Sequence, residues 1–174
     1  MKTLEPTIYY NPDLTQIING EEVMSPSPKK PHQSASSRLL RILMNYVEDH
    51  GLGEIFHAPF DVIFEENFNV LQPDILFVSN ANRDIVRDWV RGAPDLVIEI
   101  VSPGSKKMDT VIKKEIFERY GVQECWIVYP EQVSIEIYRL VDGRYTSPAL
   151  FSEHEHVVSH VLDGLSFPVN AVIK

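Results

Sequence analysis

The chain has 174 residues, 44% of them hydrophobic and 24% charged, which is typical of one globular domain with its own core. Its 16 lysines and arginines against 25 acidic residues give a net charge of −9, which argues against non-specific coating of nucleic acid but leaves local basic patches open. No hydrophobic run is long enough for a membrane span, no signal-like core opens the chain, and one cysteine excludes a disulfide framework. We therefore expect a cytoplasmic protein without membrane contact.

The first half of the chain is expected to place one long helix between short strands. Residues 1–16 look irregular, so the domain is expected to span residues 17–174, and prolines make residues 25–31 a loop. Apolar residues recur at helical spacing over residues 32–50, and Gly51 favours a helix end there. Period-two alternation around Pro59 predicts two strands, and a further strand follows Asp74.

The second half alternates strands and helices. A short helix is predicted over residues 84–90, a doubly covered strand over 96–101, a helix over 107–120 and a buried strand over 124–129. A strand–helix–strand run of this length is a βαβ unit. A strand over 133–140, a tight turn at Asp142-Gly143 and one or two more short strands complete the chain. These elements predict an α/β (α+β) fold.

Two acidic residues on neighbouring predicted strands suggest a metal site. Asp74 opens one strand, and Glu99 lies between two isoleucines of the next, where a charge is costly unless it is paired or binds a metal. Two carboxylates and the backbone carbonyl of Ile100 can hold one Mg²⁺ or Mn²⁺, and the ion would activate a water for phosphodiester hydrolysis. The alternatives are a turn-capping role for Asp74 and a structural ion pair for Glu99.

Weaker acids and a set of lysines accompany this pair. Asp95 fits a turn, and Asp109 fits a helix start, where an acid suits the helix dipole. A lysine near the metal would orient the water or neutralise the transition state, although lysines on a helix are commonly just solvated. The candidates are Lys106, Lys107, Lys113 and Lys114, and those without a catalytic role are expected, with Lys29, Lys30, Arg38 and Arg41, to contact phosphate.

Several short stretches together resemble a known family. They are NGEEVM at residues 19–24, PSP at 26–28 with His32, QPDILFV at 72–78, APDLVIEIVSP at 93–103, Asp109 with Lys113, YGV at 120–122 and WIV at 126–128. From about residue 17 to its C-terminus the chain is similar to the Uma2 family (DUF820) of predicted restriction-type endonucleases, which belongs to the PD-(D/E)XK nuclease superfamily. No single stretch is specific, but the combination is.

The resemblance implies a restriction-endonuclease-like mixed β-sheet flanked by helices, with a metal held by Asp74 and Glu99. The superfamily pattern places a lysine two residues after the glutamate, where this chain has Val101, and Lys113 matches the place from which the family supplies a lysine instead. Glu21, with Glu22 beside it, resembles the N-terminal acid that such nucleases add near the metal. His32 could contact phosphate as part of the substrate, act as an acid–base group, or be an N-terminal helix residue with no task, and the resemblance favours a place in the site. Tyr129 departs from the aspartate of the family pattern.

A second cluster offers an alternative metal site. His154 and His156 would point the same way on a strand and form a zinc pair, with Glu153, Glu155 and His160 nearby, although a solvated edge strand explains them equally. Cys125 fits a core thiol. No nucleophile elbow or phosphate loop is present.

The sequence therefore predicts a Mg²⁺- or Mn²⁺-dependent endonuclease acting on DNA. The alternative is a degenerate nuclease-fold module that binds nucleic acid or a protein partner, which the net charge and Val101 favour. A third possibility is a purely structural protein. The apolar run over residues 162–169 and exposed strand edges suggest self-association, and a homodimer would suit double-strand cleavage.

Overall fold

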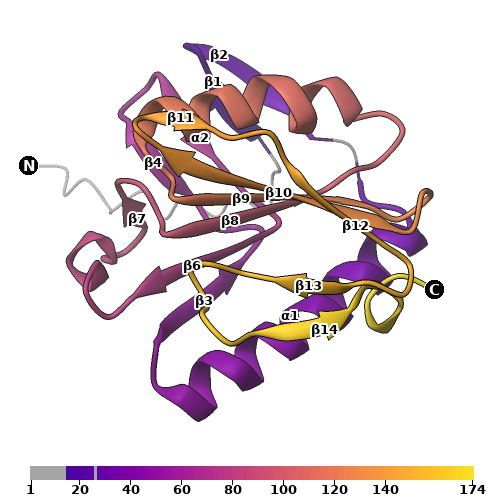
Figure 1. Ribbon diagram of the computed structural model, residues 1–174. Helices are drawn as coiled ribbons and strands as arrows, with labels where there is room; N and C mark the ends of the chain where they lie inside the picture. Colours follow the sequence, from indigo (N-terminus) through magenta and orange to yellow (C-terminus); the bar gives the residue numbers. More distant parts are fainter. Residues whose placement is uncertain (1–14, 26) are drawn as a thin grey trace, which may run out of the picture.

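The computed structural model describes residues 15–25 and 27–174 (Figure 1). The largest sheet has seven strands in the order β11-β10-β9-β8-β6-β3, with one further strand, β12, paired to β10. Its strands are β3 (Gly53–His57), β6 (Ile75–Ser79), β8 (Leu96–Ile100), β9 (Glu124–Tyr129), β10 (Ser134–Val141), β11 (Arg144–Tyr145) and β12 (Ala149–Ser152).

Two smaller sheets complete the β-structure. A five-stranded sheet has the order β2-β1-β5-β4-β7, and β13 pairs with β14. Their strands are β1 (Thr15–Ile18), β2 (Glu21–Met24), β4 (Val62–Glu65), β5 (Asn69–Leu71), β7 (Val90–Arg91), β13 (His156–Val158) and β14 (Ser166–Pro168). The helical elements are α1 (Lys30–His50), η1 (Arg83–Ile85), the π-helical turn η2 (Met108–Lys113), α2 (Lys114–Tyr120) and η3 (Val169–Ala171).

Strand β8 lies at the centre of the large sheet, as its apolar sequence predicts. It pairs antiparallel with β6 and parallel with β9, and the η2–α2 helix connects the two parallel strands. All five residues of β8 are buried. The predicted βαβ unit and the mixed sheet are therefore confirmed, and the strand that follows Asp74 lies beside the strand that carries Glu99.

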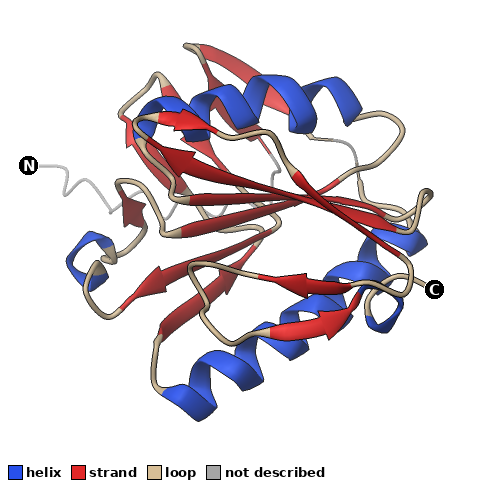
Figure 2. Cartoon of the chain, in the orientation of Figure 1, coloured by secondary structure: helices blue, strands red, loops and turns tan. Residues whose placement is uncertain are grey.

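The two main helices cover opposite faces of the large sheet (Figure 2). Helix α1 packs its buried face on one core cluster, which contains Ile98 and Ile100 of β8. Helix α2 packs on the other cluster, which contains Val97. Because successive side chains of a strand point to opposite faces, Glu99 is directed to the α2 side, where η2 begins. The helix ends at Gly51 and Gly121 are left-handed, with φ of 60° and 88°, as predicted.

The segment predicted as a helix over residues 84–90 was assigned wrongly. Only η1 is helical, and the chain then turns into the two-residue strand β7. The Val90 amide donates to the Asp61 carbonyl at 3.2 Å, and the Trp89 ring lies 6.0 Å from the Phe60 ring. These contacts with a distant segment extend the backbone and override its local helical pattern.

Two further expectations change at the chain ends. Strand β1 begins at Thr15, inside the segment expected to be irregular, whereas residues 1–14 lie outside the described residues. The apolar run over residues 162–169 does not offer a surface for self-association, because its large apolar side chains are buried in the core: Leu162, Leu165, Phe167 and Val169. The C-terminal part also forms three strands after β11 rather than one or two.

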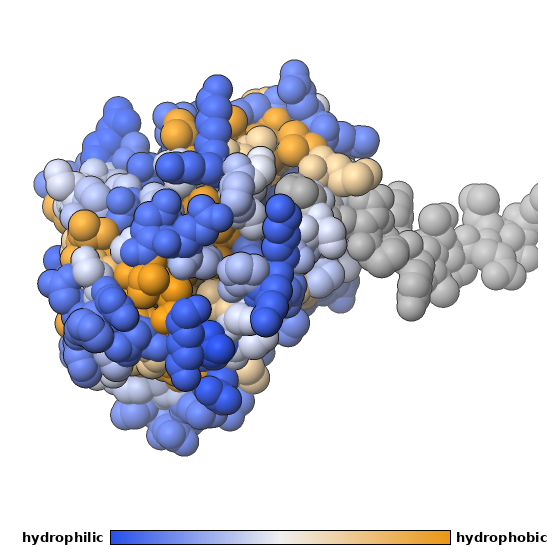
Figure 3. Space-filling view, turned by 90° about the vertical axis from the view of Figure 1, so that its right-hand side faces the viewer, coloured by the Kyte–Doolittle hydropathy of each residue, from blue (hydrophilic) through white to orange (hydrophobic). Residues whose placement is uncertain are grey.

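The described surface is largely hydrophilic on the face shown in Figure 3, where hydrophobic residues form small groups between polar ones. The three most exposed large hydrophobic side chains are Met24, Leu150 and Val158, and they come from β2, β12 and β13. Among the described residues, no helix combines the length and apolar character that a membrane crossing needs.

Candidate active site

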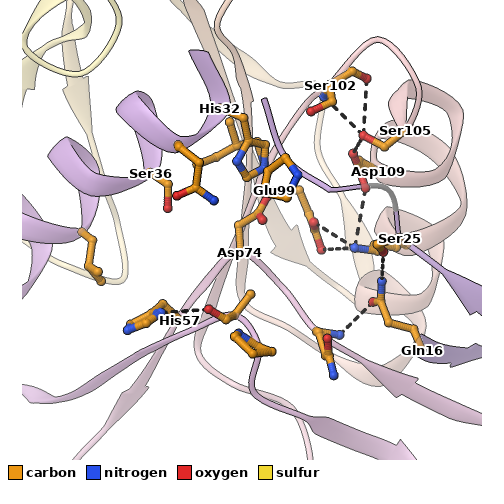
Figure 4. Close-up of a pocket in the computed structure, with 18 of the residues that line it drawn as sticks. Gln16, Ser25, His32, Ser36, His57, Asp74, Glu99, Ser102, Ser105 and Asp109 are labelled. Carbon is orange, nitrogen blue, oxygen red and sulfur yellow. Dashed lines mark hydrogen bonds and ion pairs between the residues drawn. The ribbon is translucent and has the colours of Figure 1, made fainter. Parts of the chain in front are cut away.

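A cavity of about 340 Å³ opens where the start of α1 meets the ends of β6 and β8 and the π-helical turn η2 (Figure 4). Five residues singled out by the sequence line it together: Asp74, Glu99, Ile100, Lys113 and His32. The remaining wall is mostly polar and comprises Gln16, Ser25, Pro28, Gln33, Ser36, Ser37, Leu40, His57, Ala58, Pro59, Gln72, Ser102, Ser105 and Asp109. The fold thus gathers residues from five separate stretches of the chain around one hollow.

The buried Glu99–Lys113 pair forms the floor of this site. The Lys113 ammonium donates to both carboxylate oxygens of Glu99, at 3.0 and 3.2 Å. Glu99 is 1% exposed and Lys113 is 4% exposed. Lys113 reaches Glu99 from the helix that follows β8. The ammonium beside Glu99 thus comes from the helix and not from position 101, while a catalytic role for Lys113 stays a prediction.

Asp109 belongs to the same cluster, although the sequence suggested only a helix-start role for it. Its Oδ1 lies 3.6 Å from the Lys113 ammonium, and the Ser105 hydroxyl donates to its Oδ2. Asp109 is 5% exposed. The i,i+4 spacing of Asp109 and Lys113 was a usable signal, since residues so spaced share a helix face. The sequence did not predict that this helix face is directed to Glu99, because its direction depends on the π-helical turn.

Asp74 is fixed by two donors from different elements. Its Oδ2 accepts from the Ile100 amide at 2.7 Å and from the His32 imidazole at 3.1 Å. The His32 side chain comes from the first turn of α1, 42 residues away, and its Nδ1 is buried without a hydrogen-bond partner among the described residues. The Asp74 side chain is 20% exposed and the Glu99 side chain 2%, so Asp74 is the more accessible of the two pocket carboxylates.

The charges in this cluster shift one another's protonation. Burial raises the pKa of Glu99 well above its usual range, Lys113 opposes this shift, and Asp109 and Asp74 add to it. Burial likewise raises the pKa of Asp109, against the opposing effect of Lys113. Burial alone would lower the pKa of Lys113, but the three carboxylates outweigh it and leave this pKa raised. Lys113 therefore keeps its ammonium, whereas burial favours the protonated forms of Glu99 and Asp109.

The donor set suits a hard divalent cation at the pocket side of the cluster. Carboxylate and carbonyl oxygens are the ligands that Mg²⁺ and Mn²⁺ prefer, and Asp74 and Glu99 provide them beside the backbone of Ile100. Within the described ranges, however, no three His, Cys, Asp or Glu side chains stand close enough to form a metal cage. A cation here would thus rest on two acids, the backbone and water rather than on a closed protein shell.

Comparison with known proteins identifies the family. The sequence matches the Uma2 family model, described as "Putative restriction endonuclease", over residues 9–170. The chain belongs to the Uma2 family. A solved structure from Anabaena variabilis, described as a putative nuclease of DUF820, superposes with a TM-score of 0.77 at 18% identity and covers 91% of this chain and 88% of its own. That similarity establishes the shared fold.

A second solved structure is more distant. The type IIG restriction endonuclease BpuSI gives a TM-score of 0.39 at 12% identity over 72% of this chain and 14% of its own, too low to support an argument. The search of curated proteins found no match.

Other residues suggested for the Uma2 site lie outside the pocket. Glu21 and Glu22 are exposed on β2 and do not line the cavity. Lys106 and Lys107 are exposed directly after the pocket residue Ser105, and Lys114 lies 4.2 Å from the centre of the Tyr138 ring. At the start of α1, Lys29 and Lys30 are exposed, as is Arg41 further along, whereas Arg38 donates to the Val172 carbonyl at 3.1 Å.

The histidines near the C-terminus do not gather into a second centre. His154 contacts Asn170 at 3.1 Å, and His156 contacts Ser166 at 3.1 Å. In the part of the chain that the structure describes, neither joins a group of three metal-binding side chains, so the zinc hypothesis gains no support. Cys125 is fully buried in β9, as expected for a core thiol.

Proposed function

We propose that this Uma2 protein is a Mg²⁺- or Mn²⁺-dependent endonuclease that hydrolyses DNA phosphodiester bonds in the pocket of Figure 4. The observation that carries the proposal is the convergence of Asp74, Glu99 and Lys113 on one cavity in a member of a restriction-endonuclease family. These residues come from three different elements, and a sheet of this kind has no need of a buried acid–lysine pair for its own stability.

Each of these residues has a distinct role in the proposed reaction. Asp74, Glu99 and the backbone carbonyl of Ile100 hold the cation, which when bound supplies the positive charge that activates water and neutralises the phosphate. His32 and the Ile100 amide hold the Asp74 carboxylate in one orientation. Lys113 lines the pocket beside Glu99, and its ammonium would direct an N–H toward the attacked phosphate or the incoming water.

Basic residues beside the pocket are proposed to hold the DNA backbone. Lys106 and Lys107 follow Ser105, and Lys29 and Lys30 lie between the pocket residues Pro28 and His32. Lys114, whose ammonium lies over the Tyr138 ring, is a weaker contact. Two short basic segments thus flank an acidic pocket on a protein of net charge −9. Glu21 as a further metal ligand, the homodimer and the cytoplasmic location stay predictions of the sequence.

The test combines manganese binding and DNA cleavage. Calorimetric titration with MnCl₂ should give binding to the wild type that Asp74→Asn and Glu99→Gln abolish. Cleavage of supercoiled plasmid and of single-stranded DNA should fall by about a thousandfold in both variants and in Lys113→Met. Glu115→Gln is the matched control, since Glu115 is exposed on α2 and does not line the pocket. Manganese binding that survives both acid substitutions would sink the proposal.

One observation favours the alternative of a degenerate binding module. Lys113 already engages both oxygens of Glu99, so the acid is neutralised without a metal. Such a module would bind DNA in EDTA, with an affinity that falls steeply as salt rises, and would cleave neither plasmid nor single strands with any divalent cation. Under the endonuclease proposal, DNA binding in EDTA is weak, because the pocket then repels phosphate.

A further inference from the structure

The buried charges of the pocket do not balance in the structure as it stands. Asp74, Glu99 and Asp109 contribute three carboxylates, and Lys113 contributes the one ammonium among them. Counted in their charged forms, these four groups carry a net charge of two negatives. One divalent cation cancels both charges. Since that cation by itself neutralises its proposed ligands Asp74 and Glu99, Lys113 then depends on Asp109 for a counter-charge.

A cation bound by Asp74 and Glu99 would repel the nearby ammonium of Lys113. Once a cation shares Glu99, the lysine would be a buried positive charge next to a second one, and such an arrangement is strongly unfavourable at low dielectric. The Asp109 carboxylate lies 3.6 Å from the same ammonium and offers it a second negative partner. In Figure 4 the dashed lines from Glu99 and from Asp109 meet at one nitrogen.

Hydrogen bonds with Ser105 hold the Asp109 carboxylate next to Lys113. The Ser105 hydroxyl donates to its Oδ2, which leaves Oδ1 directed to Lys113. The Asp109 amide donates to the Ser105 carbonyl at 3.0 Å, so the side chain and the backbone are tied to the same residue. Both Asp109 and Lys113 belong to the π-helical turn η2. A π-turn widens the helix locally, and such turns recur at functional sites.

We propose that Asp109 is a positioning residue: it serves as the second counter-ion of Lys113, which keeps the lysine in place when the Asp74–Glu99 pair takes up its divalent cation, so that the loaded cluster is electrically neutral. Asp109 acts through Lys113 and does not ligate the metal. This inference rests on the proposed function, since it presupposes that the Asp74–Glu99 pair binds a cation. It also limits the pocket to one divalent cation.

A double-mutant cycle measured by manganese calorimetry tests the inference on the full chain. Asp109→Asn should weaken Mn²⁺ binding by at least about tenfold, because the lysine then opposes the cation. Lys113→Met should bind Mn²⁺ at least as tightly as the wild type. The double variant restores the charge of the wild-type cluster, so its Kd should return to within about threefold of the wild-type value. Glu115→Gln, which removes the same charge from an exposed site on α2, should leave the Kd unchanged.

Two results would overturn the inference while leaving the proposed function intact. If Asp109→Asn binds Mn²⁺ like the wild type while Glu99→Gln does not bind, Asp109 has no part in loading. If the double variant binds as weakly as Asp109→Asn alone, Asp109 is a direct ligand and does not act through Lys113. If Lys113→Met does not fold by circular dichroism, Lys113→Gln replaces it in the same cycle. Loss of binding in the wild type itself would instead refute the proposed function.

Discussion

Two buried glutamates on neighbouring strands show how the same residue serves two purposes. Glu99 of β8 and Glu124 of β9 are 1% and 0% exposed. Glu124 is surrounded by neutral donors: Oε1 accepts from the Trp126 indole and the Ser159 hydroxyl, and Oε2 accepts from the backbone amides of His160 and Val161. Glu99 has instead one charged partner, the ammonium of Lys113, and a pocket beside it.

The two carboxylates differ in whether a present partner could give way to a ligand. Donors from the backbone, the Trp126 indole and the Ser159 hydroxyl saturate Glu124. They attach the segment around Ser159 to β9 and leave no free acceptor for a ligand. The partner of Glu99 is a long side chain with an alternative acceptor in Asp109. Burial of an acid therefore does not mark a functional site by itself. A cationic partner next to a cavity is what makes Glu99 the candidate.

The largest effect on stability is expected from Glu124→Gln. Either orientation of the amide would set its NH₂ group against two donors, so unfolding should become easier by about 3–5 kcal/mol. Urea denaturation in EDTA measures this loss. Manganese binding by the folded fraction of the variant should be unchanged. If a fully folded Glu124→Gln protein loses manganese binding, Glu124 and Glu99 do not act independently.

Glu99→Gln should have the opposite profile. The Lys113 ammonium keeps Asp109 as a partner, so the loss of unfolding free energy should stay below about 2 kcal/mol. Manganese binding should disappear. The same denaturation and titration experiments check both values, and a stability loss as large as that of Glu124→Gln would mean that the Glu99–Lys113 pair is structural.

The pH dependence of stability tests the environment of the pocket cluster around Glu99. The pKa values of Glu99 and Asp109 are raised by burial above their ordinary 4.5 and 3.8, so the folded state binds more protons than the unfolded state above those values. Stability contributed by this cluster is complete below that range and is lost as pH rises through the folded pKa values. Denaturation in EDTA from pH 4 to pH 8 should show a decline that is smaller in Glu99→Gln than in the wild type. Equal declines would contradict the assignment.

The smallest effects are expected from two serines, one that supports Glu124 and one that supports Asp109 in the pocket cluster. Ser159 both donates to Glu124 and accepts from the Leu162 amide at 2.9 Å, and it is 2% exposed. Ser105 is half-buried and supports Asp109 at the pocket edge. Ser159→Ala should cost about 1–3 kcal/mol, and Ser105→Ala about 0.5–1.5 kcal/mol. Thermal denaturation of the two variants checks the order, and the reverse order would show that the pocket cluster contributes more to stability than the Glu124 network.

Local periodicity in the sequence determined much of the fold. The apolar spacing of α1 and its end at Gly51, the continuous apolar run of β8 and the turn at Asp142-Gly143 all depend on neighbouring residues. The same is true of Asp74 and Glu99 as candidates, because a charge inside an apolar strand can be seen without knowing the fold. Their adjacency followed from pairing two consecutive strands.

Only the tertiary structure decided which side chains complete the site and which acids are merely structural. His32 reaches Asp74 across 42 residues, and Ser159 reaches Glu124 across 35. Contacts between residues so far apart in the chain cannot be predicted from local residue spacing. Asp109 joins the cluster because a π-helical turn sets its direction, and the run over residues 162–169 is buried because distant strands cover it. Such contacts depend on the packing of the whole chain, so no single segment can encode them.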